Sequence, residues 1–202
     1  MKPTVHYTLM VLLSVLFSRI TLSEATSGCA FQPENKTRSL YAACRMHPNT
    51  QLAPGMPKVY GQVLFKQSDP EEGLAVRFRL HGLPPSATQL RAIHIHQYGD
   101  LSEGCASTGG HYNPLGVDHP NHPGDFGNFI AQKGKIRRCV YSKATLHGEL
   151  SVLGRAVVIH EKQDDMGKGH DAGSLLHGNA GGRLACCVIG ITSPTLWDKY
   201  HN

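Results

Sequence analysis

The stretch Val76-Arg77-Phe78-Arg79-Leu80 alternates apolar and charged side chains with a period of two residues. This period predicts a β-strand with one face in a core and one in solvent, because successive side chains of a strand point to opposite sides. Similar apolar runs lie on both sides of it, separated by joints rich in glycine and proline. The sequence therefore predicts an all-β fold, an eight-stranded antiparallel barrel or sandwich of Greek-key type. The eight expected strands are Leu40–Met46, Val59–Lys66, Leu74–Leu83, Leu90–Tyr98, Phe126–Gln132, Ile136–Leu146, Arg155–Glu161 and Leu184–Ile191.

The composition is that of a globular protein of one domain with a short extension. Of the 202 residues, 40% are hydrophobic and only 17% are charged, and the 22 glycines and 12 prolines favour short strands and turns over long helices. The formal net charge of +5 comes from scattered lysines and arginines, with no dense basic block. Nucleic acid is therefore not an expected partner.

The first 25 residues have the pattern of a signal peptide. Lys2 precedes the apolar stretch Leu9–Ile20, and Ser23-Glu24-Ala25 supplies a cleavage pattern of small residues. A membrane anchor is the alternative, but two serines and an arginine interrupt the stretch, which is shorter than the roughly 20 apolar residues that a span needs. We predict a secreted protein with no membrane span.

The mature chain divides into three further segments. We expect a flexible N-terminal segment over residues 26–39, one domain over residues 40–191 and a short C-terminal tail over residues 192–202. The sequon Asn35-Lys36-Thr37 makes Asn35 a candidate glycosylation site, which agrees with secretion.

Six cysteines occur without a C-x-x-C pair, so a thiolate zinc site is not indicated. Disulfides are expected in an oxidising compartment. Cys186 and Cys187 are neighbours in an expected strand, where successive side chains point to opposite faces. These two cysteines should therefore have different partners, which the spacing alone leaves open.

Histidines gather in one strand and in one of two long connections. The connections 101–125 and 163–182 are each about twenty residues long, a length usual for functional loops. His94-Ile95-His96 places two imidazoles on one strand face, although such a pair alone is more often incidental. The first loop adds three imidazoles and a carboxylate, a tetrahedral set that suits zinc, in His111, His119, His122 and Asp125.

A fourth candidate ligand follows a later apolar run. His160 ends the run Ala156-Val157-Val158-Ile159, where a lone histidine is more often a core-edge residue than a ligand. Asp164 and Asp165 come shortly afterwards, and either carboxylate can accept the free N–H of a ligating imidazole.

These residues resemble a known family. The segments AIHIHQYGD (92–100), GHYNPL (110–115), HPGDFGN (122–128), VIHEK (158–162) with DDMGKG (164–169), and GNAGGRLAC (178–186) are similar to the copper/zinc superoxide dismutases, a resemblance that covers roughly Leu40–Ile191. It implies copper and zinc as cofactors, and a copper site formed by His94, His96, His111 and His160. It further implies a zinc site, sharing His111 with copper, formed by His111, His119, His122 and Asp125.

The resemblance also implies roles around the metals. Asp164 would link the two metal sides through hydrogen bonds, and Arg183 would attract and orient superoxide. His111 would leave copper, take up a proton and later donate it as a general acid. Lys162 and Lys168 are further candidates for the field that guides the anion.

The cysteines are assigned by the same resemblance. It pairs Cys105 with Cys186, tying the long loop to the barrel. Ala185-Cys186-Cys187 and Tyr41-Ala42-Ala43-Cys44 resemble the secreted branch of the family, which implies a disulfide between Cys44 and Cys187. The partners of Cys29 and Cys139 stay open between a mutual bond, a bond between subunits and free thiols.

The implied function is that of a secreted antioxidant enzyme that dismutes superoxide to oxygen and hydrogen peroxide. The alternatives are a secreted copper- and zinc-binding module without turnover, and a matrix protein in which metal only orders the loop. We expect a homodimer or homotetramer. Two departures from the family pattern concern Leu175, Leu176 and His177, which replace charged residues, and residues 197–202, which lack the basic cluster that strong heparin binding requires.

Overall fold

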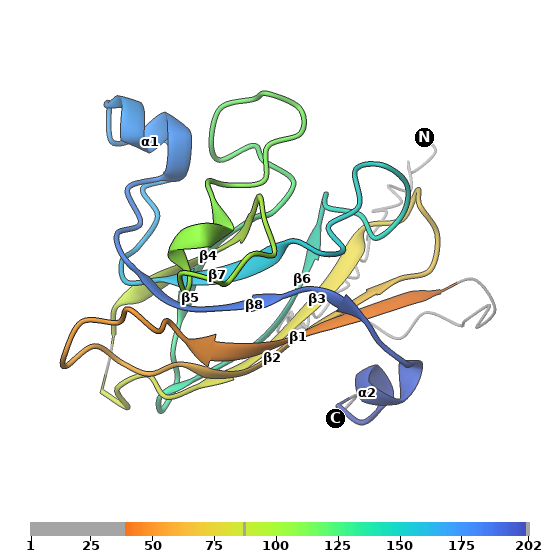
Figure 1. Cartoon of the computed structure of the whole chain (residues 1–202), viewed down its shortest axis with the longest axis horizontal. Helices are drawn as coiled ribbons and strands as arrows, with labels where there is room; N and C mark the ends of the chain where they lie inside the picture. Colours follow the sequence, from red (N-terminus) through yellow and green to blue (C-terminus); the bar gives the residue numbers. More distant parts are fainter. Residues whose placement is uncertain (1–38, 87, 201–202) are drawn as a thin grey trace, which may run out of the picture.

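The structure, a computed structural model, describes residues 39–86 and 88–200. Eight antiparallel strands and a short ninth form one sheet that curls into a nearly closed barrel (Figure 1). The strands are β1 Leu40–Pro48, β2 Tyr60–Gln67, β3 Leu74–His81, β4 Leu90–His96, β5 Asp125–Ile130, β6 Lys135–Ser142, β7 Ala156–His160, β8 Arg183–Val188 and β9 Gly190–Ile191. All eight predicted strands are confirmed, with ends that differ from the sequence prediction by at most four residues.

The order of the strands brings distant segments of the chain together. It runs β5-β4-β7-β8-β1-β2-β3-β6, and β9 pairs with β1. Strands β4, β7 and β8 are therefore neighbours, although long connections separate them in the sequence. This neighbourhood carries three of the four candidate ligands that lie on strands, and the fourth, Asp125, begins β5 beside β4.

The alternating stretch in β3 behaves as its period predicts. Val76, Phe78 and Leu80 are buried in the main core, and the Phe78 ring lies 5.3 Å from Phe126 and 4.8 Å from Phe129 between centroids. The two arginines between them point to the outer face of the sheet, where their stems can pack while the guanidinium groups stay near solvent.

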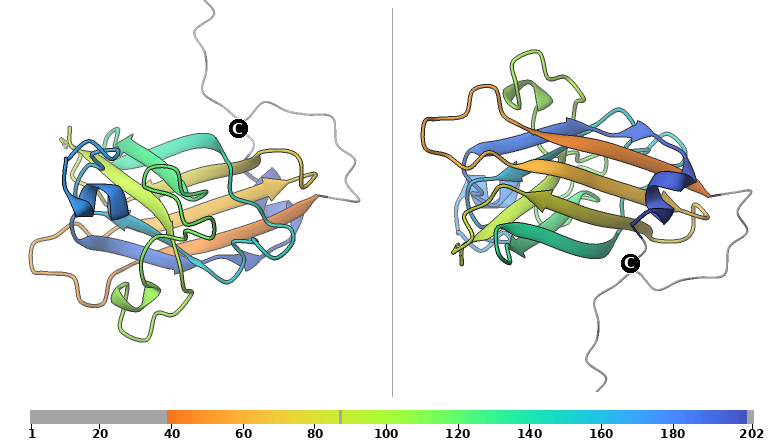
Figure 2. Two further views of the ribbon diagram at one scale, coloured as in Figure 1. Left: turned by 90° about the horizontal axis from the view of Figure 1, so that it is seen from above. Right: turned by 90° about the horizontal axis from the view of Figure 1, so that it is seen from below.

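The outer face is partly covered by the end of the chain. Helix α2, Pro194–Asp198, lies against this face near one end of the barrel (Figure 2, right). Trp197 is buried there with Leu64 and Ala75, and the Arg77 guanidinium carbon lies 4.3 Å from the Trp197 ring. The tail is thus packed on the barrel by an aromatic anchor and a cation–π contact.

The two long connections contain short helices that the sequence prediction did not include. A 3₁₀ turn, η1 Ala106–Thr108, lies in the first, and helix α1, Ala172–His177, in the second. Six residues are too few for a hydrophobic period, so α1 depends on its caps: Asp171 accepts from the Ser174 N–H, and Gly178 ends it at φ 66°. Within the described ranges, no helix is long and apolar enough to cross a membrane.

Candidate metal centre

Strands β4 and β7 supply three of the four histidines of one cluster. His94 and His96 share the face of β4 opposite Ile93 and Ile95, which are buried in the main core. His160 ends the neighbouring strand β7, where the pairing with β8 shifts by one residue. Such bulges re-aim side chains beside functional sites. All three imidazoles are at least nine-tenths buried.

The fourth histidine comes from the first long loop. His111 forms an isolated bridge with His96, and the Tyr112 N–H donates to the Ile95 carbonyl at 2.8 Å. This short pairing holds the loop beside the end of β4. Ring centroids of His94 and His111 are consequently only 4.1 Å apart.

The four rings form a candidate copper site. One ring nitrogen from each of His94, His96, His111 and His160 lies within 4.8 Å of the others. Nε2 of His96 and Nε2 of His160 face each other at 3.2 Å. Burial is the largest cause that lowers the pKa of both rings, followed by neighbouring imidazoles, with Arg183 contributing as well. Neutral imidazoles in a compact set are the form that binds copper.

The second cluster shares His111 and forms a candidate zinc site. Nδ1 of His111 lies 3.0 Å from Asp125 Oδ1, while Nδ1 of His119 and Nδ1 of His122 lie 2.9 and 3.0 Å from Asp125 Oδ2. Donor atoms of a tetrahedral zinc lie about 3.3 Å apart when the bonds are about 2.0 Å long. The spacing therefore fits zinc, and Nε2 of His111 is left for the copper side.

Asp164 connects the two clusters. It is fully buried, and its two carboxylate oxygens accept from Nε2 of His94 at 2.9 Å and Nε2 of His119 at 2.8 Å. Burial raises the pKa of this carboxyl, but the two imidazoles and the Met166 N–H outweigh burial, so the pKa lies below its ordinary value. An ionised Asp164 fixes both rings with Nδ1 turned toward a metal.

Asp165 does not share this role. Its Oδ1 accepts from Ser174 Oγ at 2.7 Å and its Oδ2 from Asn179 Nδ2 at 2.8 Å. The expectation that either aspartate could face the imidazoles is therefore wrong for Asp165, because its side chain points into its own loop. It stabilises the fold of that loop around α1 instead.

The buried atoms of these clusters support metal binding. Nδ1 of His94, His119 and His122 is buried in each case without a hydrogen bond. Two of these nitrogens are close to Asp125, but the N–H directions do not suit hydrogen bonds. Burial lowers the pKa of His111 to about 4, whereas the nearby carboxylates of Asp125 and Asp164 outweigh burial and raise the pKa of His119 to about 9. Buried ring nitrogens without partners cost roughly 1–3 kcal/mol each, so cations at these positions would satisfy them.

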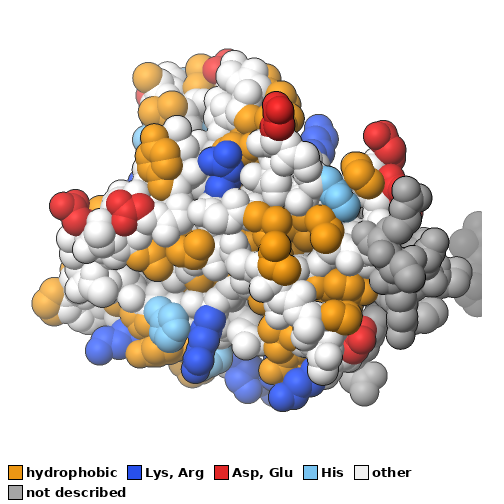
Figure 3. Space-filling view, turned by 45° about the vertical axis from the view of Figure 1, so that its right-hand side comes forward, with side chains coloured by type: hydrophobic (Ala, Val, Ile, Leu, Met, Phe, Trp, Pro, Cys, Tyr) orange, Lys and Arg blue, Asp and Glu red, His pale blue; other side chains and the backbone are white. Residues whose placement is uncertain are grey.

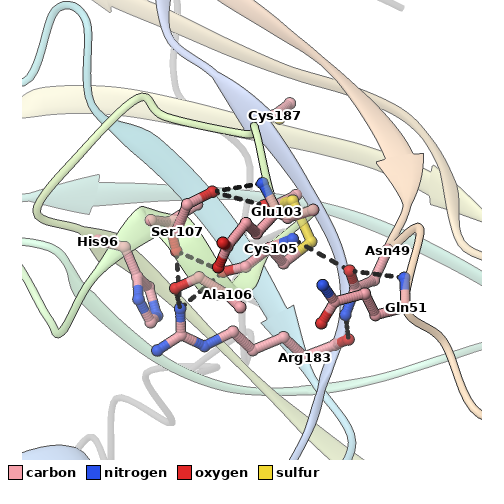
Figure 4. The surroundings of a disulfide bond; sticks show 12 residues. Asn49, Gln51, His96, Glu103, Cys105, Ala106, Ser107, Arg183 and Cys187 are labelled. Atoms are coloured by element: carbon pink, nitrogen blue, oxygen red, sulfur yellow. Dashed lines mark hydrogen bonds between the residues drawn. A yellow bond between two sulfur atoms is a disulfide. The ribbon is translucent and has the colours of Figure 1, made fainter.

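Arg183 is fixed beside the candidate copper site. Its guanidinium donates to the Cys105 carbonyl at 2.7 Å (Figure 4). It also donates to the Gly109 carbonyl at 2.7 Å and to Thr108 Oγ1 at 2.9 Å. The Gly109 carbonyl also accepts from Nδ1 of His96 at 2.9 Å. One carbonyl therefore ties the guanidinium to a ligand of the copper cluster.

Comparison with known proteins agrees with this geometry. The family model described as copper/zinc superoxide dismutase matches residues 59–189. The chain belongs to the copper/zinc superoxide dismutase family. Extracellular superoxide dismutase [Cu-Zn] of Rattus norvegicus is 49% identical over 170 residues, covering 83% of this chain and 70% of the relative. The same enzyme of Homo sapiens is 50% identical over 164 residues, covering 80% and 68%, and that of Drosophila melanogaster is 45% identical over 142 residues, covering 66% and 77%.

The predicted enzyme class and cofactors are thereby confirmed. This chain is a copper/zinc superoxide dismutase, with both ligand sets complete. The alternative of a metal-binding module without turnover is not favoured, because the family, the copper set and the zinc set occur together. The relatives named above are extracellular enzymes.

The dismutase contains both disulfides that the resemblance implied. Cys105 is bonded to Cys186 and Cys44 to Cys187. The neighbouring cysteines of β8 thus have different partners, as the opposite faces of a strand predict. Cys139 in β6 is also disulfide-bonded. Cys29 lies outside the described residues, as do the expected signal peptide and Asn35.

Sequence reasoning gave no role to two residues of the site. Asn128 clamps the backbone of Asp164, accepting from its N–H at 2.8 Å and donating to its carbonyl at 2.8 Å. Asn49 bonds to the backbone of both Arg183 and Cys105. Asn128 lies in a segment that resembles the family, whereas nothing in the sequence around Asn49 signals a role.

Proposed function

We propose that this dismutase is secreted, that Arg183 guides superoxide to the copper side and that His111 handles the proton. The observation that carries the proposal is the guanidinium of Arg183, which four acceptors of the segment 105–109 hold beside His96. A fixed cation beside a reaction site concentrates a small anion and orients it.

Each residue has a distinct task in this scheme. Copper bound to the four-histidine set would supply the one-electron oxidation and reduction of superoxide. Arg183 binds the anion and turns one oxygen toward the site. Nε2 of His111 takes up one proton from solvent and gives it to the peroxide, which takes its second proton from solvent, while Nδ1 stays on the zinc side beside Asp125. Lys162 and Lys168, both exposed, add to the positive field.

The role of Arg183 is tested by Arg183→Ile in the copper- and zinc-loaded protein. Stopped-flow decay of superoxide at low ionic strength should be about tenfold slower and less sensitive to salt. Enzymes of this class are the standard example of electrostatic steering, so the expected tenfold loss of rate reflects the known behaviour of the class. Arg137→Ile, which removes the same charge from an exposed site on the outer sheet face, is the control. An unchanged rate in the Arg183 variant would contradict the proposal.

Secretion rests on two features of the chain and on its relatives. The signal pattern in residues 1–25 agrees with the extracellular relatives, and disulfides persist in oxidising compartments. Expression in cultured eukaryotic cells should place the protein in the medium, beginning near Thr26 and carrying a glycan at Asn35. Intracellular retention of the unprocessed chain would refute this part of the proposal.

The assembly is proposed to be a homodimer or homotetramer. Apolar side chains lie in several exposed groups on one face of the molecule (Figure 3), and Ile191 of β9 is 77% exposed. The outer face of β1, β2, β3 and β6 is unsuited to pairing with the same face of a second copy, because the cationic side chains gathered there would repel one another. These are Arg45, Arg79, Lys135 and Arg137. Light scattering after size-exclusion chromatography would measure the mass, and a monomer at micromolar concentration would exclude the proposal.

Strong heparin binding is not part of the proposed function. Between Thr192 and Tyr200 the only cationic side chain is Lys199. Polyanion affinity grows with the number of cations that meet the polymer. The protein should therefore leave a heparin column below about 0.3 M salt, and retention far above that concentration would show a matrix-binding function.

A further inference from the structure

Asn49 joins the backbone of Arg183 to the loop that holds the Arg183 guanidinium. Its Nδ2 donates to the Arg183 carbonyl at 3.1 Å, and its Oδ1 accepts from the Cys105 N–H at 3.0 Å. Its own N–H donates to the Leu184 carbonyl at 2.9 Å. Figure 4 shows this side chain between the two segments. One planar amide therefore spans the end of β1, the start of β8 and the loop.

The loop side of this bridge begins the segment that receives the guanidinium. The carbonyls of Cys105, Ala106 and Gly109 accept from Arg183, as does Thr108 Oγ1. The Asn49 amide thus holds both the backbone of Arg183 and the segment that carries the acceptors of its side chain. Their separation decides how far the guanidinium reaches toward the copper side.

Close packing leaves this bridge little freedom. A Cβ added at Gly104 would lie 2.4 Å from Asn49 Oδ1 and 2.5 Å from Thr50 Oγ1. The loop backbone therefore lies directly against the end of β1, which only glycine allows at this position. The Gln51 N–H also donates to Asn49 Oδ1 at 3.2 Å, fixing the amide orientation from the other side.

We infer that Asn49 is a positioning residue for Arg183, which sets the guanidinium at the distance needed to receive the anion. The inference rests on the proposed role of Arg183. An asparagine suits the task because its amide carries a donor and an acceptor in one rigid plane. Aspartate keeps the acceptor for Cys105 but places an oxygen against the Arg183 carbonyl, and alanine removes both bonds.

A double-mutant cycle between Asn49→Ala and Arg183→Ile tests the inference in the metal-loaded protein. At low ionic strength Asn49→Ala should slow superoxide decay about threefold, because small displacements of a positioning group reduce rates. In the Arg183→Ile background the same change should have no further effect. An equal loss in both backgrounds, or no loss in either, overturns the inference. An unaltered rate in Arg183→Ile alone would instead refute the proposed function.

Asn49→Asp separates positioning of Arg183 from anchoring of the loop. It retains the acceptor for the Cys105 N–H, so a residue that only anchors the loop would leave the rate unchanged. Positioning predicts a loss at least as large as that of Asn49→Ala. Gln51→Glu introduces the same charge two residues away in an exposed position and serves as the matched control.

Anion affinity gives a readout that does not depend on turnover. Azide titrated into the copper- and zinc-loaded protein can be followed by visible absorption. Asn49→Ala should raise the azide dissociation constant about threefold, while Gln51→Ala, which leaves its backbone N–H in place, should not. Azide affinity equal to that of the unmodified protein in both Asn49 variants would overturn the inference.

Discussion

The Cys105–Cys186 disulfide should stabilise the barrel and also shape the anion site. The perturbation is the pair Cys105→Ala and Cys186→Ala, which removes the bond without leaving a lone thiol. The bond joins residues 81 apart in the sequence, and Cys44–Cys187 joins residues 143 apart. Because Cys186 and Cys187 are neighbours, Cys44–Cys187 closes a ring of chain, and Cys105–Cys186 divides that ring into stretches of about 80 and about 60 residues.

The magnitude follows from loop-closure entropy. With Cys44–Cys187 intact, two stretches of chain connect Cys105 to Cys186, so the loop that their bond closes behaves like a single loop of about 35 residues. Losing Cys105–Cys186 should therefore lower the free energy of unfolding by about 4 kcal/mol. The reverse case, removal of Cys44–Cys187, leaves an effective loop of about 60 residues and gives a similar loss of about 4 kcal/mol. The two variants should thus be nearly equal in stability.

Activity should separate the two variants. Cys105 carries a carbonyl that accepts from Arg183, so its release should slow superoxide decay about threefold at low ionic strength. Cys44 and Cys187 are buried in the main core, and no metal ligand belongs to that cluster. Loss of their bond should leave the rate of the metal-loaded protein within about twofold.

The assay is guanidinium chloride unfolding of the metal-free proteins, followed by stopped-flow kinetics of the loaded proteins. Metal-free protein is used because ligand binding adds to apparent stability. A loss below about 1 kcal/mol for the Cys105 pair would refute the entropy argument. Equal loss of activity in both pairs would refute the link between this disulfide and Arg183.

Three further changes test other parts of the structure. Asp164→Asn should weaken metal retention about tenfold to a hundredfold in competitive chelator titrations, because one amide cannot accept from both imidazoles; unchanged affinity would contradict this role. Gly178→Ala should weaken zinc binding about tenfold, since the new Cβ would lie 2.1 Å from Asp164 Oδ1 and 2.6 Å from His119 Nε2; Gly148→Ala, at the same φ of 66° but with open space around it, should not. Trp197→Ala should lower the free energy of unfolding by about 3 kcal/mol, measured by denaturation, with unchanged superoxide decay; a fall in the rate would show that α2 reaches the site.

Much of the fold could be predicted from local patterns. The period of two in β3 is a property of successive residues, so all eight long strands were visible in the sequence, with uncertainty only at their ends. Helix α1 was not visible, because six residues do not complete two helical turns. It forms because Asp171 and Gly178 cap it and because Asp165 and Asn179 hold its loop, contacts that no local period reveals.

The sequence by itself determined which side chains could bind metal. Six histidines and Asp125, in a family-like order, carried the ligand sets, and the adjacent Cys186 and Cys187 required different partners. The tertiary structure decided which atom faces which group. It turned Asp164 and not Asp165 toward the imidazoles, and gave His111 one nitrogen for each metal side. It also brought Asn49 to Arg183, 134 residues later in the chain. Hydrogen-bond choices of this kind depend on separations of a few tenths of an ångström, which are set by the strand order and loop packing of the whole barrel.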